Sequence, residues 1–196
     1  MRAPFRLALT AALIMTASGV LAAPPAQPPL TPSSIVAAAP ATDWRRVDPN
    51  DMLVIDLAHD GRVVIELAGS FAPVHIANIR ALARAHWYDG LSIERVQDDY
   101  VTQWGDPDGT KPLPAGIARP APAEYERSAQ GLHLDALPYR DTFADHSGFV
   151  GGWPTAENDG QAWLVHCYGM VGVGRDLNPD TGTGAELYAV IGHAPR

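Results

Sequence analysis

Glycine and proline interrupt this chain so often that it has room for few long secondary-structure elements. Each occurs 18 times among 196 residues, and both residue types mark turns and loops. The runs between them are mostly short and rich in β-branched residues, and one run shows clear helical spacing. No alternation of strands and helices repeats along the chain. The pattern therefore predicts a mainly β protein built on an antiparallel sheet or barrel with a packed helix.

The turn signals place the predicted elements. Two β-rich runs, Met52 to Leu57 and Arg62 to Leu67, flank the pair Asp60-Gly61, which is typical of a tight hairpin. Apolar residues then recur at helical spacing from Pro73 to about Ala85, and proline is well tolerated in the first turn of a helix. The remaining strand candidates are Leu91 to Val96, Tyr100 to Trp104, Glu124 to Arg127, Tyr168 to Val173 and Glu186 to Ile191.

Three segments are predicted to lack regular structure. Residues 23–50 are rich in proline and alanine and are interpreted as a linker, so that the folded domain spans residues 51–196. Residues 106–122 are crowded with glycine and proline and are expected to form a loop. Residues 128–161 show no clean periodicity and are interpreted as a long irregular insertion, a kind of segment that often shapes access to a site.

Residues 1–22 have the features of a secretory signal peptide. Arg2 and Arg6 precede an apolar run from Leu7 to Leu21, and Ala22 offers a small residue suited to cleavage. The run is too short to span a bilayer comfortably, and an uncleaved anchor is the alternative interpretation. The chain is therefore expected to be periplasmic or secreted, without stable membrane association after cleavage. Its one cysteine, Cys167, allows no internal disulfide.

Charge and histidine spacing exclude several classes of partner. Lys and Arg total 14 against 22 for Asp and Glu, which gives a formal net charge of −8. A nucleic-acid-binding domain would need a basic face, and docking on an anionic membrane would need one too. The seven histidines never fall into a His-Glu-x-x-His or similar ligand spacing. Nucleic acid, metals and cofactors are therefore not expected.

Two adjacent segments carry a specific family resemblance. The first, Tyr88 to Val96, reads Tyr-Asp-Gly-Leu-Ser-Ile-Glu-Arg-Val, and the second, Tyr100 to Pro107, reads Tyr-Val-Thr-Gln-Trp-Gly-Asp-Pro. They resemble, without a gap, the Tyr-Asp-Gly-x-x-Phe-His-Arg-Val and Phe-Met-x-Gln-Gly-Gly-Asp-Pro segments of cyclophilin-type peptidyl-prolyl cis/trans isomerases. Gly184 to Tyr188 is similar to a drifted Gly-Ser-Gln-Phe-Phe, and Gly172 to Arg175 occupies the place of Ser-Met-Ala-Asn.

This resemblance implies a fold, an activity and a site. The family's fold is an eight-stranded antiparallel barrel with two helices, and its activity is rotation about X-Pro bonds of polypeptides without a cofactor. Arg95 matches the catalytic arginine, and Gln103 matches the glutamine beside the substrate carbonyl. The residues that match substrate-binding positions are Tyr100, Val101, Gly174, Arg175, Glu186, Leu187 and Tyr188.

An arginine beside apolar surface suits this chemistry. The peptide C–N bond resists rotation with a barrier of about 18–20 kcal/mol because of its double-bond character. In the twisted transition state the imide nitrogen gains a lone pair, so a guanidinium aimed at it binds that state better than the planar forms. Apolar surface holds the proline ring and strengthens the electrostatic effect. The alternative is that Arg95 is simply solvated or paired with an acid, as most strand arginines are.

Departures from the family pattern surround the predicted site. Glu94 and Ile93 stand where histidine and phenylalanine are common. Ala185-Glu186 replaces Ser-Gln, and Glu186 is placed to pair with Arg95 or Arg175, which would weaken catalysis. The chain also stops before the family's last strands and second helix. We therefore hypothesise a fragment of a longer parent, with exposed edges on the first and last predicted strands, residues 52–57 and 186–191.

Three functions remain open from the sequence. The leading hypothesis is an exported isomerase that acts on proline-containing polypeptides. The second is a binding or chaperone module that holds proline-containing segments on the same fold without turnover. The third is a truncated chain with no function.

Overall fold

The computed structural model describes residues 29–139 and 141–192, so the predicted signal peptide over residues 1–22 lies outside the described residues. The chain divides into two units, Met1–Arg45 and Arg46–Arg196. The first unit contains a short helix, α1 (Pro32–Ala38), and a 3-10 turn, η1 (Ala41–Asp43). None of the described helices is long and apolar enough to cross a membrane.

Helix α1 corrects the prediction that the linker segment has no regular structure. It begins at Thr31, whose hydroxyl accepts a hydrogen bond from the backbone N–H of Ser34 at 3.2 Å, while the Ser34 hydroxyl accepts from the N–H of Thr31 at 2.9 Å. This reciprocal cap satisfies donors that a helix start leaves unpaired. No residue of α1 is buried, so the helix is a local feature of the linker.

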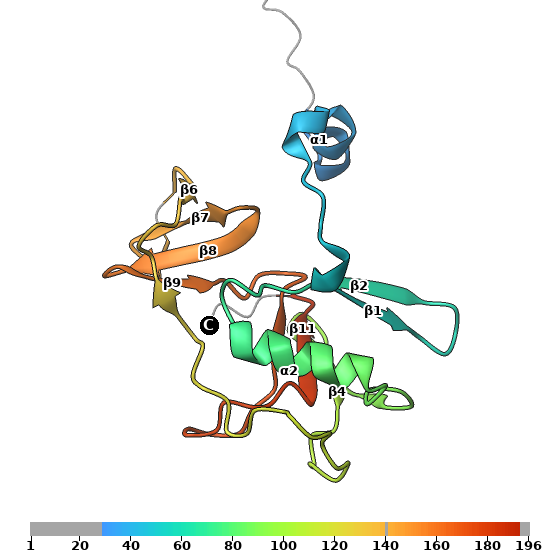
Figure 1. Cartoon of the computed structure of the whole chain (residues 1–196). Coiled ribbons are helices and arrows are strands. Elements are labelled where there is room, and N and C mark those ends of the chain that lie inside the picture. Colours follow the sequence, from blue (N-terminus) through green and yellow to red (C-terminus); the bar gives the residue numbers. More distant parts are fainter. Residues whose placement is uncertain (1–28, 140, 193–196) are drawn as a thin grey trace, which may run out of the picture. The chain divides into compact units, whose positions relative to one another are not determined.

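The second unit consists of antiparallel sheets, as the sequence predicts, and one long helix (Figure 1). A short turn, η2 (Pro49–Asp51), leads into the hairpin of β1 (Met52–Asp56) and β2 (Arg62–Glu66). A four-stranded sheet has the order β10-β11-β4-β3. Its strands are β3 (Ser92–Gln97), β4 (Val101–Gly105), β10 (Val171–Val173) and β11 (Glu186–Val190).

Helix α2 (Pro73–Arg84) confirms the predicted helix and forms part of the core. Its buried face includes Ile76 and Ile79, which join Leu53, Leu67 and Leu187 in one apolar cluster. Helical periodicity places such residues on a single stripe, and burial of that stripe against the sheet stabilises the helix. The helix therefore packs against β11, as Figure 1 also indicates.

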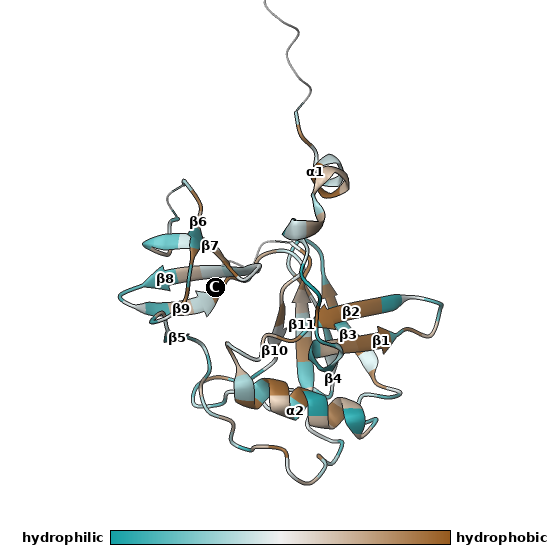
Figure 2. Ribbon diagram, turned by 45° about the horizontal axis from the view of Figure 1, so that its top comes forward, coloured by the Kyte–Doolittle hydropathy of each residue, from teal (hydrophilic) through white to brown (hydrophobic). Residues whose placement is uncertain are grey.

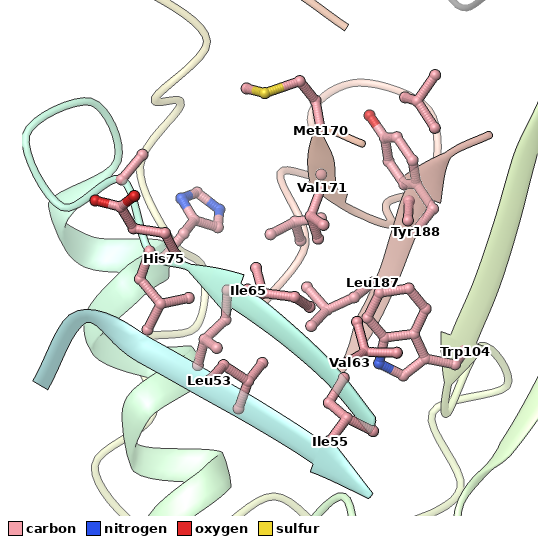
Figure 3. Close-up of a pocket in the computed structure, with 18 of the residues that line it drawn as sticks. Leu53, Ile55, Val63, Ile65, His75, Trp104, Met170, Val171, Leu187 and Tyr188 are labelled. Atoms are coloured by element: carbon pink, nitrogen blue, oxygen red, sulfur yellow. The ribbon is translucent and has the colours of Figure 1, made fainter. Parts of the chain in front are cut away.

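The strands of the described unit form three separate sheets instead of a closed barrel. Within the described residues, β1 and β2 pair with each other alone, and Figure 2 shows apolar residues running along both. A hollow of about 1680 Å³ lies between this hairpin and the four-stranded sheet (Figure 3). Apolar side chains of both sheets line it, including Leu53, Ile55, Val63, Ile65, Trp104, Val171 and Leu187.

The prediction of an exposed edge on the last strand is wrong. Strand β11 pairs with β4 on one side and with β10 on the other, so its backbone groups are engaged on both edges. The family resemblance predicts an edge over Glu186 to Ile191, because the family has further strands after this segment that are not in the sequence. Strand β10 supplies a partner through a short segment that ends at Val173.

The predicted irregular insertion over residues 128–161 is also wrong, because the segment folds into a sheet with the order β5-β9-β8-β7-β6. Two-residue turns of Gly151-Gly152 and Asp159-Gly160 join its central strands, and all four residues have positive φ, which matches the right-handed twist of a hairpin. The strands are β5 (Arg127–Ser128), β6 (Asp135–Ala136), β7 (His146–Val150), β8 (Trp153–Asn158) and β9 (Gln161–Leu164).

The predicted strand over Glu124 to Arg127 is reduced to the first residue of β5. Glu124 instead caps α2 from a distant loop. Its carboxylate accepts hydrogen bonds from the backbone N–H groups of Val74 at 2.9 Å and His75 at 3.0 Å. The helix needs this outside partner because the N-cap residue, Ala72, offers no side-chain acceptor.

Candidate functional site

Three of the predicted site residues lie side by side on one face of the four-stranded sheet. Arg95 of β3 is in register with Gln103 of β4, which is in register with Tyr188 of β11. On the next strand Tyr188 is opposite Gly172 of β10. Residues directly opposite each other in antiparallel strands point to the same side. We call Arg95, Gln103 and Tyr188 the Arg95 row.

A β-bulge places Arg95 on this face. Ile93 is in register with Trp104, yet Arg95 is in register with Gln103, so β3 carries one extra residue between them. In a regular strand Ile93 and Arg95 would point to the same side, because side chains alternate. Glu94 is the extra residue, and it lets Arg95 face the opposite side from Ile93.

Arg95 is held by neutral partners. Its guanidinium donates to Oε1 of Gln103 at 3.5 Å and to Oε1 of Gln97, and it lies 5.7 Å from the centre of the Tyr100 ring. An arginine over an aromatic ring is attracted by the electron-rich face. None of these partners carries a charge that would cancel that of the guanidinium.

Glu186 contacts the Arg95 row through Gln103. In place of the ion pair with Arg95 or Arg175 that the sequence suggested, its Oε1 accepts a hydrogen bond from Nε2 of Gln103. The carboxyl group also lies against Gly174, where an added Cβ would be 2.6 Å from the Glu186 carboxyl carbon. Glycine at this position therefore leaves the space that the Glu186 side chain occupies.

Tyr188 forms an aromatic wall next to Gln103. Its ring crosses Gly172, where an added Cβ would be 2.4 Å from the ring, and its hydroxyl lies 3.1 Å from Nε2 of His166. Burial raises the pKa of Tyr188, Tyr100 raises it further, and Arg175 opposes the rise. Burial also lowers the pKa of His166. The tautomer of His166 sets which of the two groups donates in this hydrogen bond.

The other predicted site residues lie either near the Arg95 row or in the core. Val101 is 4% exposed and lies on the side of Gln103, two residues away on β4. Tyr100 precedes β4 and is 40% exposed. Arg175 lies at the margin, with its guanidinium 5.1 Å from the ring of Tyr125. Leu187 is 1% exposed and points away from the row into the core.

The large hollow of Figure 3 shares Tyr188 with the Arg95 row. It borders Leu187 and Trp104, which are in register with each other on the opposite side of the sheet. Tyr188 and His166 also line the hollow, whereas Arg95 and Gln103 do not. The hollow therefore belongs to the core between the hairpin and the sheet.

Three features of the site gave no sequence signal. The bulge at Glu94 depends on the register of two strands, which a single strand pattern does not reveal. His166 and Tyr188 are separated by 22 residues and meet through tertiary folding. Gln97 lies just beyond the predicted strand Leu91 to Val96, yet it ends β3 and contacts Arg95.

Comparison with known proteins places this arrangement in context. Residues 52–191 match the family model described as cyclophilin type peptidyl-prolyl cis-trans isomerase/CLD. The crystal structure of cyclophilin AquaCyp293 from Hirschia baltica superposes with a TM-score of 0.65 and 25% identity, over 85% of this chain and 66% of that chain.

Curated relatives match shorter parts of the chain. Peptidyl-prolyl cis-trans isomerase ppi1 of Schizosaccharomyces pombe is 44% identical over 50 residues, which is 26% of this chain and 32% of that protein. A putative thylakoid lumen peptidyl-prolyl cis-trans isomerase of Synechocystis is 28% identical over 133 residues, 65% of this chain and 32% of that protein. The chain thus spans about a third of the length of these curated relatives.

Proposed function

Because this chain belongs to the family of cyclophilin-type peptidyl-prolyl cis-trans isomerases, we propose that it accelerates rotation about X-Pro bonds in other polypeptides. The observation that carries this proposal is the placement of Arg95, Gln103 and Tyr188 on one face of the sheet. The row combines a permanent charge, an amide and an aromatic ring. The reaction needs no acid, base, nucleophile or cofactor, because no covalent bond is made or broken.

Arg95 is the proposed catalytic residue. Its guanidinium keeps its charge at any relevant pH, and its hydrogen-bond partners, Gln97 and Gln103, are neutral amides. The charge therefore stays available for the lone pair that develops on the imide nitrogen as the bond twists. Each 1.36 kcal/mol of stabilisation that is specific to the twisted state raises the rate about tenfold.

The neighbouring side chains are proposed to bind the substrate. Val101, the ring of Tyr188 and the ring of Tyr100 supply apolar surface for the proline, and Gln103 lies where it can meet the substrate carbonyl. The backbone N–H of Gly174 already donates to the carbonyl of Glu186 at 2.8 Å. We therefore assign the backbone contact with substrate to Arg175, and we assign Leu187 to the support of β11 from the core side.

We propose that the protein acts outside the cytoplasm. The signal-like residues 1–22 support it, and one matched relative is named as a putative thylakoid lumen isomerase. Mass spectrometry of the protein from the periplasm and the medium of expressing cells tests this part. A mature N-terminus near Ala23 is expected, and an intact Met1 in the cytoplasm would contradict it.

The proposed activity is tested with a protease-coupled assay on a proline-containing peptide. Wild-type protein should accelerate the cis-to-trans step, and the Arg95→Ala variant should not. A wild-type protein that binds the peptide but leaves the exchange rate unchanged would instead identify a binding or chaperone module on the same fold. The exposed strand arginine of β2, changed in Arg62→Ala, is the matched control.

A further inference from the structure

We propose that Glu186 is a positioning residue for the Arg95 row and that it acts through the side-chain amide of Gln103. This inference rests on the isomerase function proposed above and names a second layer of the same site. The relay runs from Glu186 on β11, through Gln103 on β4, to Arg95 on β3. It assigns a role to one of the residues that depart from the family motif.

The first step is the orientation of the Gln103 amide. A carboxylate can only accept hydrogen bonds, so it selects the NH2 side of the amide. Nε2 of Gln103 donates to Oε1 of Glu186, and the amide oxygen is thereby turned the other way. That oxygen accepts from the Arg95 guanidinium at 3.5 Å. With the amide reversed, two donors would face each other and the contact with Arg95 would be lost.

The second step is the immobilisation of Glu186 itself. Its backbone is paired on both sides, with Gly105 of β4 in register and the N–H of Gly174 donating to its carbonyl at 2.8 Å. Its side chain fills the space above Gly174, where any Cβ would come within 2.6 Å of the carboxyl group. The strand pairing therefore fixes the backbone of Glu186, and the glycine leaves room for its carboxylate to reach Gln103.

The third step is the effect on Arg95. The guanidinium is contacted by Gln103, by Gln97 and by the ring of Tyr100. Of these contacts, Gln103 is oriented by the carboxylate of Glu186. Hydrogen bonds to an ionised acceptor are shorter and about twice as strong as neutral ones. Glu186 thus limits the positions that the guanidinium can adopt, and a fixed donor stabilises a transition state better than a mobile one.

Four variants test the relay. Glu186→Ala removes the acceptor, and Glu186→Gln keeps a neutral acceptor and matches the glutamine of the family motif. Gly174→Ala keeps the carboxylate but displaces it. Glu157→Ala, a strand carboxylate of β8 in a different sheet, is the matched control. Thermal melts report whether each variant folds.

The readouts are isomerase kinetics, the dissociation constant of a proline-containing peptide, and the side-chain amide NMR signals of Gln103, assigned by their absence in Gln103→Leu. We expect Glu186→Ala and Gly174→Ala to lower kcat by about tenfold, as for loss of a charge-assisted hydrogen bond, with a less than twofold change in the dissociation constant. Both variants should shift the Gln103 signals. Glu186→Gln should recover at least about a third of the rate, and Glu157→Ala should match the wild type.

Two results would overturn the inference. Unchanged Gln103 signals in Glu186→Ala would show that Glu186 does not orient the Gln103 amide. A weaker peptide affinity with unchanged kcat would show that Glu186 contacts the substrate directly. An inactive wild-type protein whose Gln103 signals still respond to Glu186→Ala would contradict the proposed isomerase function while supporting the contact. The two proposals therefore fail in different ways.

Discussion

Arg95 stands opposite Gln103, and β3 carries one extra residue, Glu94, between Arg95 and Ile93. The extra residue lets Ile93 stay in register with Trp104 on the core side of the sheet while Arg95 faces the other side. The bulge thus places the apolar side chain of Ile93 and the charged side chain of Arg95 on opposite sides of the sheet. Bulges are common where a strand must re-aim a side chain at a site.

The division of β11 into two sides predicts different effects for two adjacent residues. Leu187→Ala removes a core side chain that is 1% exposed, so it should lower the free energy of unfolding by about 2–3 kcal/mol. Tyr188→Ala removes the aromatic wall and should raise the KM for a proline-containing peptide by about tenfold, as expected for loss of an aromatic contact. Urea melts and steady-state kinetics on both variants check this. Equal effects of the two variants on KM would contradict the assignment of sides.

Gly105 is predicted to tolerate no side chain. Its φ is +125°, and an added Cβ would lie 2.2 Å from the carbonyl oxygen of Ala185 and 2.8 Å from Cα of Glu186. Both are backbone atoms, so the strand pairing of β4 with β11 must move. Gly105→Ala should therefore lower the free energy of unfolding by about 3 kcal/mol or more.

Gly90→Ala is the matched control for this effect. Gly90 also has a positive φ, +77°, but an added Cβ would meet nothing within 4 Å. Gly90→Ala should lower the free energy of unfolding by about 1 kcal/mol, because a residue with a side chain is disfavoured in this backbone conformation. Denaturant melts of both variants measure the difference in the free energy of unfolding. Equal values would show that the close approach of β11 to Gly105 does not contribute to the loss of stability.

The cap of α2 by Glu124 predicts a pH-dependent stability. Burial raises the pKa of Glu124, but hydrogen bonds from the N–H groups of His75 and Val74 and from the His75 ring, at 2.6 Å, lower it more, so the net shift is downward. A carboxyl whose pKa is lowered by folding stabilises the folded state above its unfolded pKa and loses that contribution as pH falls through the folded value.

The Glu124→Gln variant measures this contribution. It should be less stable than wild type by about 1–2 kcal/mol at pH 7, as for the loss of a helix cap. The difference should shrink as the pH falls below the ordinary glutamate pKa of about 4.3 and through the lower folded value, because the wild-type carboxyl then takes up its own proton. Urea melts at pH 7 and pH 3 check the trend. A stability difference that is the same at both pH values would contradict the cap.

Local signals were sufficient for the elements around the site. Asp60-Gly61 marks the β1–β2 hairpin because its residues adopt a tight turn, and the apolar spacing after Pro73 gives α2. The pairing of Arg95 with Gln103 follows from two strands joined by a short turn. The bulge between Ile93 and Arg95 does not, because it is a shift in the register of the two strands that the residues of one strand do not reveal.

Long-range contacts account for what the sequence did not predict. Glu124 was read as a strand residue, yet its role depends on Val74 and His75, about 50 residues earlier in the chain. The sheet over residues 128–161 was missed although Gly151-Gly152 and Asp159-Gly160 are hairpin signals. Its strands lack clean alternation: in β8 the consecutive residues Thr155 and Ala156 are both buried.

The central claim is that Arg95 favours the twisted imide over its planar forms. NMR exchange spectroscopy on a saturating proline-containing peptide, with wild type, Arg95→Lys, Arg95→Ala and the Arg62→Ala control, separates binding from rotation. The account predicts that Arg95→Ala binds the peptide within about threefold of wild type but lowers the exchange rate about 100-fold, as for the loss of one preorganised donor, with Arg95→Lys in between. An exchange rate in Arg95→Ala equal to that of wild type would contradict the account.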